Sequence, residues 1–335
     1  MKKFKLGIFG ITGAVGQELK NVLFERDFPL ESLRVFASSR SVDKQVETSL
    51  GTLTVENANE ANFGEFDICL FAIGGGWPKE YAYKATEQGA YVIDNSSTFR
   101  YEDSVPLVIP EINPEAIGES KLISNPNCTT AIAAIPLWVI HKNFGLKKVI
   151  ISTYQATSGA GAEGMTELEE ETKKYLNNEE VGCNVFAHPI CFNIIPHIDK
   201  FQENDYTKEE MKVVWETRKI FGDSSIPISC TCVRIPTMRA HAESIVVETE
   251  KEISPGEVKE LFEKTPGLEL RDKISENTYP MPLTASKKYD VEVGRVRQNL
   301  IFGKNGVEFF VCGDQILKGA ALNTVQIAEV IKDKF

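Results

Sequence analysis

The sequence lacks the features typical of membrane, secreted or nucleic-acid-binding proteins. Its 335 residues contain no apolar run long enough to cross a bilayer. Basic residues are outnumbered, with 37 Lys and Arg against 48 Asp and Glu, and the net charge of −11 argues against nucleic acid or an anionic membrane as the main partner. The apolar segment near the start is interrupted by Gly7, Gly10 and Gly13, so we expect no signal peptide.

Cysteine and histidine occur without the spacings of a metal site. The seven cysteines include no CxxC pair and form no zinc-type cluster with the four histidines, so we expect no metal. Reduced thiols indicate a cytoplasmic protein. Cys230 and Cys232 share one face of a predicted strand and are predicted to lie in the core. Four others are predicted to be small buried side chains: Cys69, Cys183, Cys191 and Cys312.

The chain is long enough for two domains, and its patterning changes along its length. Short apolar runs alternate with helical patterns at first, which predicts a parallel sheet with strands at Lys5–Phe9, Leu33–Ala37, Phe66–Ile73, Ala90–Asp94, Leu107–Ile109 and Lys121–Ile123. Later runs predict a mixed or antiparallel sheet: Lys147–Ala156, Ile228–Ile235, His241–Glu250 and Tyr289–Arg297. Asn305-Gly306 predicts a tight hairpin, and Thr207 and Ser254 each begin a capping box.

A glycine-rich turn follows the first strand and opens the first helix: Gly10, Ile11, Thr12, Gly13, Ala14, Val15 and Gly16. Such a turn lets a pyrophosphate approach the helix N-terminus. The second strand ends without the acid that NAD sites usually use to bind the ribose 2′-hydroxyl. Instead Ser38, Arg40 and Ser41 suit the 2′-phosphate of NADP, although a structural turn and a solvated loop are the alternatives.

Cys128 is the candidate nucleophile. Asn125 and Asn127 precede it, and an apolar helical run, Ala131–Ile140, follows, so Cys128 is expected at a helix N-terminus. There the helix dipole favours the thiolate, and free N–H groups can stabilise an oxyanion. Among the histidines, His241 lies between two predicted strands, where catalytic groups often project, but position alone favours it only modestly.

The motifs together resemble the aspartate-β-semialdehyde dehydrogenase family over almost the whole chain. The matching segments are Gly10–Gly16, Ala37–Ser41, Asp94–Ser97 with Arg100, Asn125–Thr130, Tyr154–Gly161, Asn193–Pro196, Glu209–Lys212, Arg234–His241 and Lys318–Asn323. Two positions depart from the family pattern: Val42-Asp43 stands where a glycine often precedes the lysine, and Arg239 adds a second arginine beside the substrate strand.

The resemblance implies an α/β fold and a two-part chain. Residues 1–127 would form a Rossmann-type NADP-binding domain, joined by a C-terminal helix over 316–335. Residues 128–315 would form an α+β catalytic and dimerisation domain, in a homodimer or homotetramer. The implied activity is that of an NADP-dependent phosphorylating oxidoreductase. It interconverts L-aspartate 4-semialdehyde and L-4-aspartyl phosphate through a cysteine thioester, in the biosynthesis of lysine, threonine and methionine.

The resemblance also implies a role for each matching residue. Cys128 would be the nucleophile, with Asn127 beside it, His241 the acid/base, and Gln155 would orient the substrate. Arg234 would bind the substrate carboxylate and Glu209 its ammonium group. Further contacts would come from Arg100 and Lys212 to phosphate, and from Ser158, Gly159 and Gln315 to the cofactor.

Three other functions share parts of this motif set. N-acetyl-glutamyl-phosphate reductase has a similar plan, but the Glu209–Lys212 and Arg234–His241 segments favour the aspartyl substrate. A cysteine hydrolase would leave the glycine turn unexplained. A non-catalytic NADP-binding redox sensor, in which Cys128 is merely oxidised, is the alternative from outside enzymology.

Overall fold

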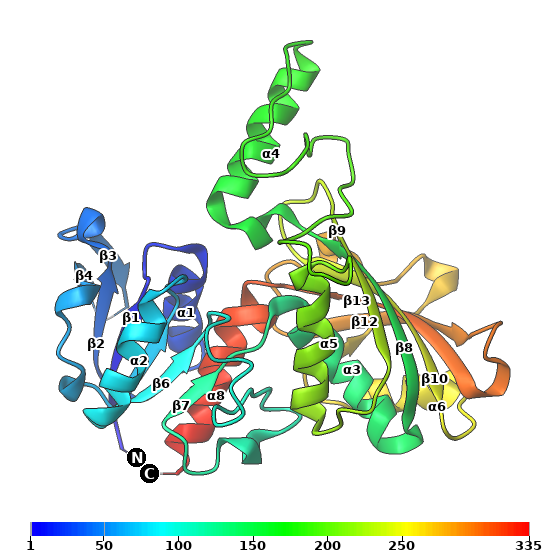
Figure 1. Ribbon diagram of the computed structural model, residues 1–335, viewed down its shortest axis with the longest axis horizontal. Coiled ribbons are helices and arrows are strands. Elements are labelled where there is room, and N and C mark those ends of the chain that lie inside the picture. Colours follow the sequence, from blue (N-terminus) through cyan, green and yellow to red (C-terminus); the bar gives the residue numbers. More distant parts are fainter. Residues whose placement is uncertain (1, 50, 335) are drawn as a thin grey trace. The chain divides into compact units, whose positions relative to one another are not determined.

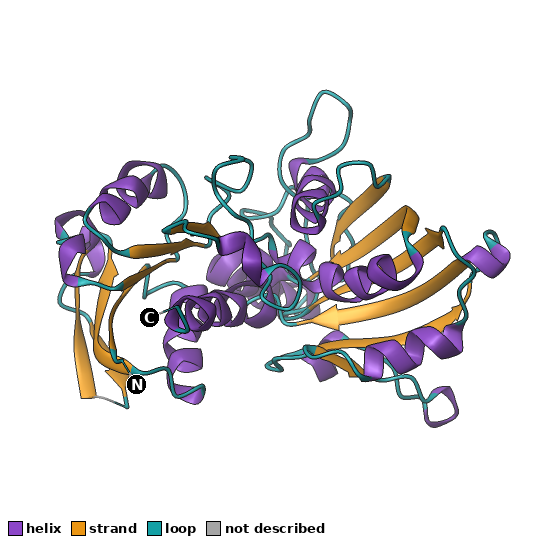
Figure 2. Cartoon of the chain, turned by 90° about the horizontal axis from the view of Figure 1, so that it is seen from below, coloured by secondary structure: helices purple, strands orange, loops and turns teal. Residues whose placement is uncertain are grey.

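The computed structural model describes residues 2–49 and 51–334 and divides into two compact units, each built on its own sheet (Figures 1 and 2). Unit 1 comprises Met1–Asn127 and Ala320–Phe335, and unit 2 comprises Cys128–Gly319.

Unit 1 is a doubly wound α/β unit whose first strand lies inside the sheet. The strand order is β3-β4-β2-β1-β5-β6-β7, and all neighbours are parallel except β3 and β4. The strands are β1 (Phe4–Phe9), β2 (Leu30–Ala37), β3 (Gln45–Thr48), β4 (Gly51–Asn57), β5 (Ile68–Phe71), β6 (Tyr91–Asp94) and β7 (Leu122–Ser124). The helices are α1 (Ala14–Glu25), α2 (Trp77–Glu87) and α8 (Leu322–Lys332). β2 and β4 lie on one side of β1, and β5, β6 and β7 lie on the other. The strand order therefore reverses between β1 and β5, and the loops after these two strands form a switch point of the Rossmann type.

The last helix completes unit 1. Asn323 donates to the carbonyl of Val108 and to the side-chain oxygen of Asn125, at 2.9 and 2.7 Å. Thr324 donates to the side chain of Asn95 at 2.8 Å. Arg26, the C-cap residue of α1, forms a bidentate pair with Glu329. The C-terminal helix is therefore held by buried hydrogen bonds as well as by apolar packing.

Unit 2 contains a six-stranded mixed sheet in the order β11-β12-β13-β10-β8-β9. The strands are β8 (Leu146–Gln155), β9 (Ile228–Arg234), β10 (His241–Thr249), β11 (Leu268–Leu270), β12 (Val291–Gln298) and β13 (Gly306–Gly313). The helices are α3 (Cys128–Phe144), α4 (Gly161–Leu176), α5 (Lys208–Phe221), α6 (Pro255–Glu263) and α7 (Pro282–Ala285). Helix α3 packs against both α5 and α6 and against β8, β10 and β13, so these helices cover one face of the sheet.

The α/β class and the mixed sheet are confirmed, as are the capping boxes at Thr207 and Ser254. The strand predicted at Leu107–Ile109 is wrong: these buried residues make only an isolated bridge, from Leu107 to Ser124. A short apolar run fits a buried loop as well as a strand.

Two further predictions are wrong. Asn305-Gly306 forms no two-residue turn, because Gly306 has an extended φ of −141° and already belongs to β13. The connection starts at Asn299, whose side-chain oxygen accepts the N–H groups of Ile301 and Phe302 at 3.0 Å. Cys183 is exposed, in the loop that follows α4, whereas Cys69, Cys191, Cys230, Cys232 and Cys312 are buried as predicted.

A carboxylic acid lies inside unit 2 without a hydrogen-bond partner among the residues that the structure describes. Glu243 of β10 is fully buried on the helix-covered face, level with Thr153 of β8 and Val311 of β13. Neither carboxyl oxygen has a hydrogen-bond partner among the described residues. Burial raises the pKa of Glu243 well above its usual value, because the apolar surroundings favour the neutral acid over the carboxylate.

The neutral acid makes the stability of the protein depend on pH. Because the pKa of Glu243 is higher in the folded than in the unfolded chain, its contribution is complete below the unfolded value and is lost as pH rises through the folded value. Glu243→Gln replaces the titratable carboxyl group with an amide that does not titrate. As pH rises, wild type should lose this contribution and the variant should not. The free energy of unfolding of the variant minus that of wild type should therefore increase, by up to about 1.4 kcal/mol per pH unit. Urea unfolding between pH 5 and 9 measures this difference. Glu263→Gln, at an exposed position of α6, is the control, and parallel curves for wild type and Glu243→Gln would contradict the prediction.

Candidate active site

The glycine turn lines a cavity of about 450 Å³ in unit 1. Its lining residues come from the ends of parallel strands and the segments after them: Gly10, Thr12, Gly13, Ala37, Ser38, Ser39, Ala58, Asn59, Ala72, Ile73 and Trp77. This is the position at which Rossmann-type sheets bind dinucleotides.

The three glycines of the turn do different things. Gly10 has φ +100°, and a Cβ there would lie 2.5 Å from the carbonyl oxygen of Ala72. A Cβ on Gly16 would collide with the carbonyl oxygen of Gly10, so both positions are fixed by the chain's own packing. Gly13 meets nothing closer than 3.5 Å, and it caps α1 without a side-chain hydrogen bond. Its missing side chain keeps the helix N-terminus open to the cavity, which fits a pyrophosphate.

The segment after β2 carries the hydroxyls and the arginine. Ser39–Ser41 form a short 3-10 turn, in which Arg40 is exposed and Ser41 is buried. Ser38 lines the cavity. The Arg40 guanidinium makes no hydrogen bond or ion pair with other residues that the structure describes, and no acid stands in this segment. The residues present therefore fit an anionic group at the rim.

Cys128 is the first residue of α3 and is partly exposed. Buried Asn125 and Asn127 precede it, so the polar residues before the helix are packed rather than solvated. The predicted placement at a helix N-terminus is confirmed. The macrodipole there favours the thiolate.

Three strands of unit 2 bring polar side chains to one level on the helix-covered face. Gln155 ends β8 and is paired with Arg234, which ends β9. His241 starts β10, one position beyond the Ala242–Tyr154 pair, and so stands level with Gln155. All three side chains are buried. Since alternate strand residues face the same side, the sheet itself sets this row of guanidinium, amide and imidazole.

The amide of Gln155 is held on both sides. Its side-chain oxygen accepts the hydroxyl of Thr153 at 3.0 Å, and its NH₂ group donates to Glu209 at 3.2 Å. Glu209 and Lys212 lie one turn apart on α5 and form an ion pair of 2.9 Å. Lys212 also pairs with Asp199 at 2.8 Å. Burial lowers the pKa of Lys212, but Glu209 and Asp199 outweigh burial and raise it above its usual value.

Arg234 has an unsatisfied donor inside the site. Its Nη1 donates to the carbonyl of Ala156 at 2.5 Å, and its guanidinium lies 5.6 Å from the ring centre of Phe186. The Nε group is buried and finds no acceptor among the described residues. Burial lowers the pKa of Arg234, while the nearby groups of Glu209 and Cys128 raise it. A guanidinium with a buried orphan donor suits a carboxylate ligand.

The imidazole of His241 is held in one tautomer. The N–H of Ala156 donates to Nδ1 at 3.0 Å, so the proton of the neutral ring lies on Nε2. Nε2 is buried and makes no hydrogen bond with a described residue. Burial, followed by the charge of Arg234, lowers the pKa of His241 well below its usual value. The site therefore contains a neutral imidazole with an available N–H group.

Two glycines leave room beside these groups. A Cβ on Gly159 would lie 2.8 Å from Nη1 of Arg234 and 3.1 Å from Nε2 of His241. A Cβ on Gly319 would lie 2.6 Å from Cβ of Cys128. Gly319 belongs to a π-helical turn, Leu317–Ala321, an irregularity common at functional sites.

The remaining predicted residues lie in both units. Ser158 and Gln315 are buried in unit 2 and are joined by a hydrogen bond from the Gln315 amide to the Ser158 hydroxyl. Arg100 is buried in unit 1 and donates to the carbonyl of Asn95 at 2.8 Å. The structure thus brings together Cys128, Gln155, Gly159, Glu209, Lys212, Arg234 and His241 in unit 2, and the glycine turn with Ser38 in unit 1.

The sequence interpretation missed Thr153, Ala156 and Asp199. Thr153 orients Gln155, Asp199 pairs with Lys212, and Ala156 contacts both His241 and Arg234 through its backbone. Ala156 makes both contacts through its backbone, which every residue type except proline could do. The residue type therefore gave no signal for this role. Thr153 had a weak one, because a threonine two residues before Gln155 faces the same side of the strand.

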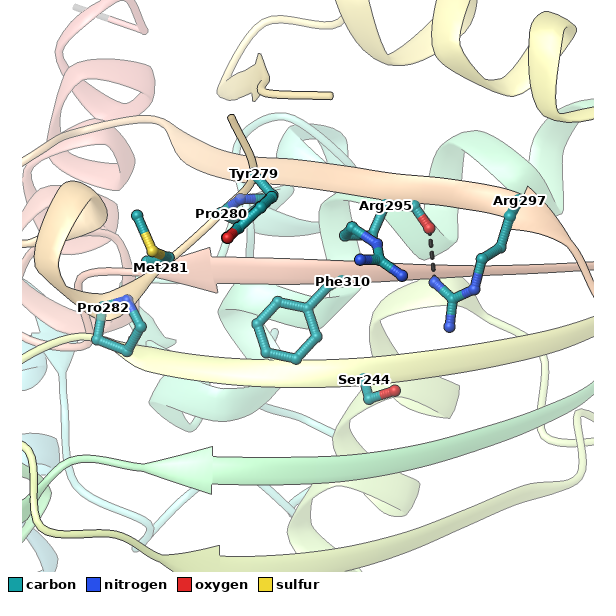
Figure 3. Close-up of a pocket in the computed structure, with 8 residues that line it drawn as sticks. All are labelled: Ser244, Tyr279, Pro280, Met281, Pro282, Arg295, Arg297 and Phe310. Atoms are coloured by element: carbon teal, nitrogen blue, oxygen red, sulfur yellow. Dashed lines mark hydrogen bonds between the residues drawn. The ribbon is translucent and has the colours of Figure 1, made fainter. Parts of the chain in front are cut away.

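A second cavity, of about 360 Å³, lies on the opposite face of the unit 2 sheet (Figure 3). Ser244 of β10 and Phe310 of β13 point into it, away from the face that holds His241 and Glu243. The other lining residues are Tyr279, Pro280, Met281, Pro282, Arg295 and Arg297. None of the predicted site residues is among them.

The described residues contain no group of three or more His, Cys, Asp or Glu side chains that could hold a metal ion. Among the same residues no helix is both long enough and apolar enough to span a membrane.

Family models match both halves of the chain. Residues 5–120 match the semialdehyde dehydrogenase NAD-binding domain, and residues 137–318 match the semialdehyde dehydrogenase dimerisation domain. The aspartate-semialdehyde dehydrogenase of Aquifex aeolicus is 45% identical over 333 residues, which cover 98% of each chain.

Solved structures agree with these matches. Aspartate-semialdehyde dehydrogenase II of Vibrio cholerae, solved in complex with ASA, is 42% identical, with a TM-score of 0.97 over 100% of both chains. The enzyme of Candida albicans, solved with NADP, is 25% identical, with a TM-score of 0.78 over 99% of each chain. The glycine turn, the cysteine that begins α3 and the row of side chains at the strand ends thus occur in a chain that belongs to the aspartate-semialdehyde dehydrogenase family of oxidoreductases.

Proposed function

We propose that the protein, as a homodimer or homotetramer, interconverts L-aspartate 4-semialdehyde and L-4-aspartyl phosphate with NADP, through a thioester on Cys128. This reaction would serve the biosynthesis of lysine, threonine and methionine. The observation that carries the proposal is the row of Gln155, Arg234 and His241 on one face of one sheet. Two of these residues have buried donors without partners among the described residues, Nε of Arg234 and Nε2 of His241. A substrate with a carboxylate and an aldehyde oxygen supplies an acceptor for each.

Cys128 would act as a thiolate that attacks the aldehyde carbon, forming a C–S bond and leaving the electron pair of the C=O bond on oxygen. The N-terminus of α3 and the nearby positive charge of Arg234 both favour the thiolate. Nε2–H of His241 would donate to the resulting hemithioacetal oxygen. His241 would hold its proton on that atom because Nδ1 already accepts a backbone N–H.

Bound NADP⁺ would supply the hydride acceptor for the next step. As the hydride leaves the hemithioacetal carbon, the electron pair on oxygen re-forms the carbonyl, and a thioester on Cys128 results. Inorganic phosphate would then attack the thioester carbon, forming aspartyl phosphate and releasing the thiolate. We assign Arg100 and Lys212 to phosphate and Glu209 to the substrate ammonium, with Asn127 beside the nucleophile. Ser158, Gly159 and Gln315 are assigned to the nicotinamide end of the cofactor.

The experiment that tests the function is a steady-state assay of NADPH formation with the semialdehyde, NADP and phosphate. Wild type should turn over continuously with phosphate and give at most one NADPH per site without it, followed by slow hydrolysis. Cys128→Ser should bind NADP but lose turnover by roughly a thousandfold or more, because a hydroxyl replaces the thiolate. Fast turnover without phosphate would contradict the acyl-phosphate mechanism. A serine variant that kept a tenth of wild-type kcat would remove Cys128 from the chemistry.

The planar shape of Arg234 should matter more than its charge. Arg234→Lys keeps a cation but loses the fork that can hold a carboxylate through two hydrogen bonds, as well as the contact to Ala156. We expect kcat/KM for the semialdehyde to fall by roughly a hundredfold, with cofactor affinity nearly unchanged. Kinetics at saturating NADP and phosphate measure both quantities. Wild-type kcat/KM in the lysine variant would exclude Arg234 from substrate binding.

Arg40 should discriminate between the two nicotinamide cofactors. If its guanidinium binds the 2′-phosphate, Arg40→Ala should weaken NADP binding by roughly ten- to hundredfold and leave NAD binding unchanged. Titration calorimetry with each cofactor measures this difference. Lys44→Ala, at an exposed basic residue nearby, is the matched control. Equal losses for NADP and NAD would show that Arg40 only supports the loop.

A further inference from the structure

The mechanism does not use the ion pair of Arg239 and Asp314 in unit 2. Arg239 lies in the connection between β9 and β10, and its Nε donates to Asp314 at 2.5 Å. The carboxylate of Asp314 is fully buried and the Arg239 side chain is 18% exposed. A buried carboxylate of this kind requires several donors if it is to stay charged. Their positions indicate what the pair does.

The donors to Asp314 come from segments far apart in the chain. One carboxyl oxygen accepts Arg239 and the N–H of Lys287, the latter at 2.6 Å. The other accepts the N–H groups of Ile316 and Leu317, at 3.0 and 3.1 Å. The carbonyl of Asp314 accepts the N–H of Gly319 at 3.1 Å. Asp314 therefore fixes the segment that leads into the π-helical turn Leu317–Ala321. Gly319 of this turn lies against Cys128.

Gln315, the residue after Asp314, contacts the same β9–β10 connection that contains Arg239. The Gln315 side-chain oxygen accepts the N–H of Ala240 at 2.8 Å. Ala240 is fully buried and has φ +69°, a left-handed conformation that an alanine rarely adopts. Such a conformation persists only where the surroundings enforce it. Asp314 and Gln315 thus hold the two residues immediately before His241: Asp314 through its ion pair with Arg239, and Gln315 through its hydrogen bond from Ala240.

We propose that Arg239 and Asp314 are positioning residues whose ion pair fixes the imidazole of His241 relative to the thiol of Cys128. The pair joins the segment that leads into His241 to the segment that backs Cys128. The backbone groups that share Asp314 with Arg239 belong to Lys287, Ile316 and Leu317, and the mechanism assigns none of these three residues to the substrate. The proposal rests on the roles of Cys128 and His241 in the proposed function.

The test compares Arg239→Gln and the double variant Arg239→Gln/Asp314→Asn with wild type. The single variant leaves Asp314 as a buried charge without its arginine, so its melting temperature should fall. The double variant removes both charges and should recover part of that loss. Its kcat should nevertheless stay at least about tenfold below wild type, with KM for semialdehyde and phosphate changed less than about threefold, because the loops are no longer tied. Recovery of kcat together with the melting temperature would overturn the proposal.

A matched control breaks a different ion pair of unit 2. Lys259 of α6 pairs with the buried carboxylate of Asp272 at 2.9 Å. Helix α6 packs against β11 and β12, at the sheet edge opposite β9. Lys259→Gln should lower the melting temperature as Arg239→Gln does but leave kcat within about twofold of wild type. Equal kcat losses in the two variants would show that any buried ion pair has the same effect, and would overturn the proposal.

A second readout does not require turnover. The rate of Cys128 alkylation by iodoacetamide, measured against pH, reports the thiolate directly. In the double variant we expect the midpoint of this profile to shift by roughly half a pH unit or more, since both the imidazole and the backing turn can move. An unchanged profile would overturn the proposal. If wild type itself shows no turnover with the semialdehyde, the proposed function fails, and the alkylation profile still tests the ion pair.

Discussion

The register of three neighbouring strands is the constraint on which the site depends. Strands β8, β9 and β10 are paired so that Gln155, Arg234 and His241 stand level on the inner face. A shift of one residue in any of these pairings would turn a functional side chain to the outer face. The next level holds Thr153, Cys232 and Glu243, and the one after it Ile151, Cys230 and Ile245. Along the strands, away from the row of Gln155, Arg234 and His241, the inward-facing side chains therefore become less polar level by level.

Backbone groups complete what the side chains begin. Ala156, the residue after β8, donates its N–H to His241 and accepts Arg234 on its carbonyl, so one peptide orients both groups. Gly159 and Gly319 then allow close approach to the imidazole, the guanidinium and the nucleophile. Any added side chain at these two glycines would meet an atom of the site within 3.1 Å. The chemistry is thus supported by main-chain geometry as much as by the residues that carry it.

The fold class and the main strands could be predicted from sequence because hydrophobic periodicity and glycine placement are local signals. Cys128 could be placed at a helix N-terminus for the same reason: polar residues stop where an apolar helical run begins. Local signals gave wrong predictions where tertiary packing or a side-chain hydrogen bond determines the backbone conformation. The segment Leu107–Ile109 is apolar but forms a buried loop instead of a strand. In the β12–β13 connection the side chain of Asn299, rather than Asn305-Gly306, accepts the hydrogen bonds that shape the turn. The tautomer of His241, the buried acid at Glu243 and the contacts of Arg239 depend on tertiary structure, and no pattern in the sequence contains them.

The division of unit 1 into two stretches of chain has a consequence for biosynthesis. Its sheet is made first, but the helix that covers it, α8, is made only after all of unit 2 has been synthesised. Until then the carbonyl of Val108 and the side chains of Asn95 and Asn125 lack the hydrogen bonds that Asn323 and Thr324 give them. Unit 2 is a continuous stretch of chain, so no later segment is needed to complete it. The nucleotide-binding part is thus expected to reach its native state only after the whole chain has been synthesised, although its sheet comes first in the sequence.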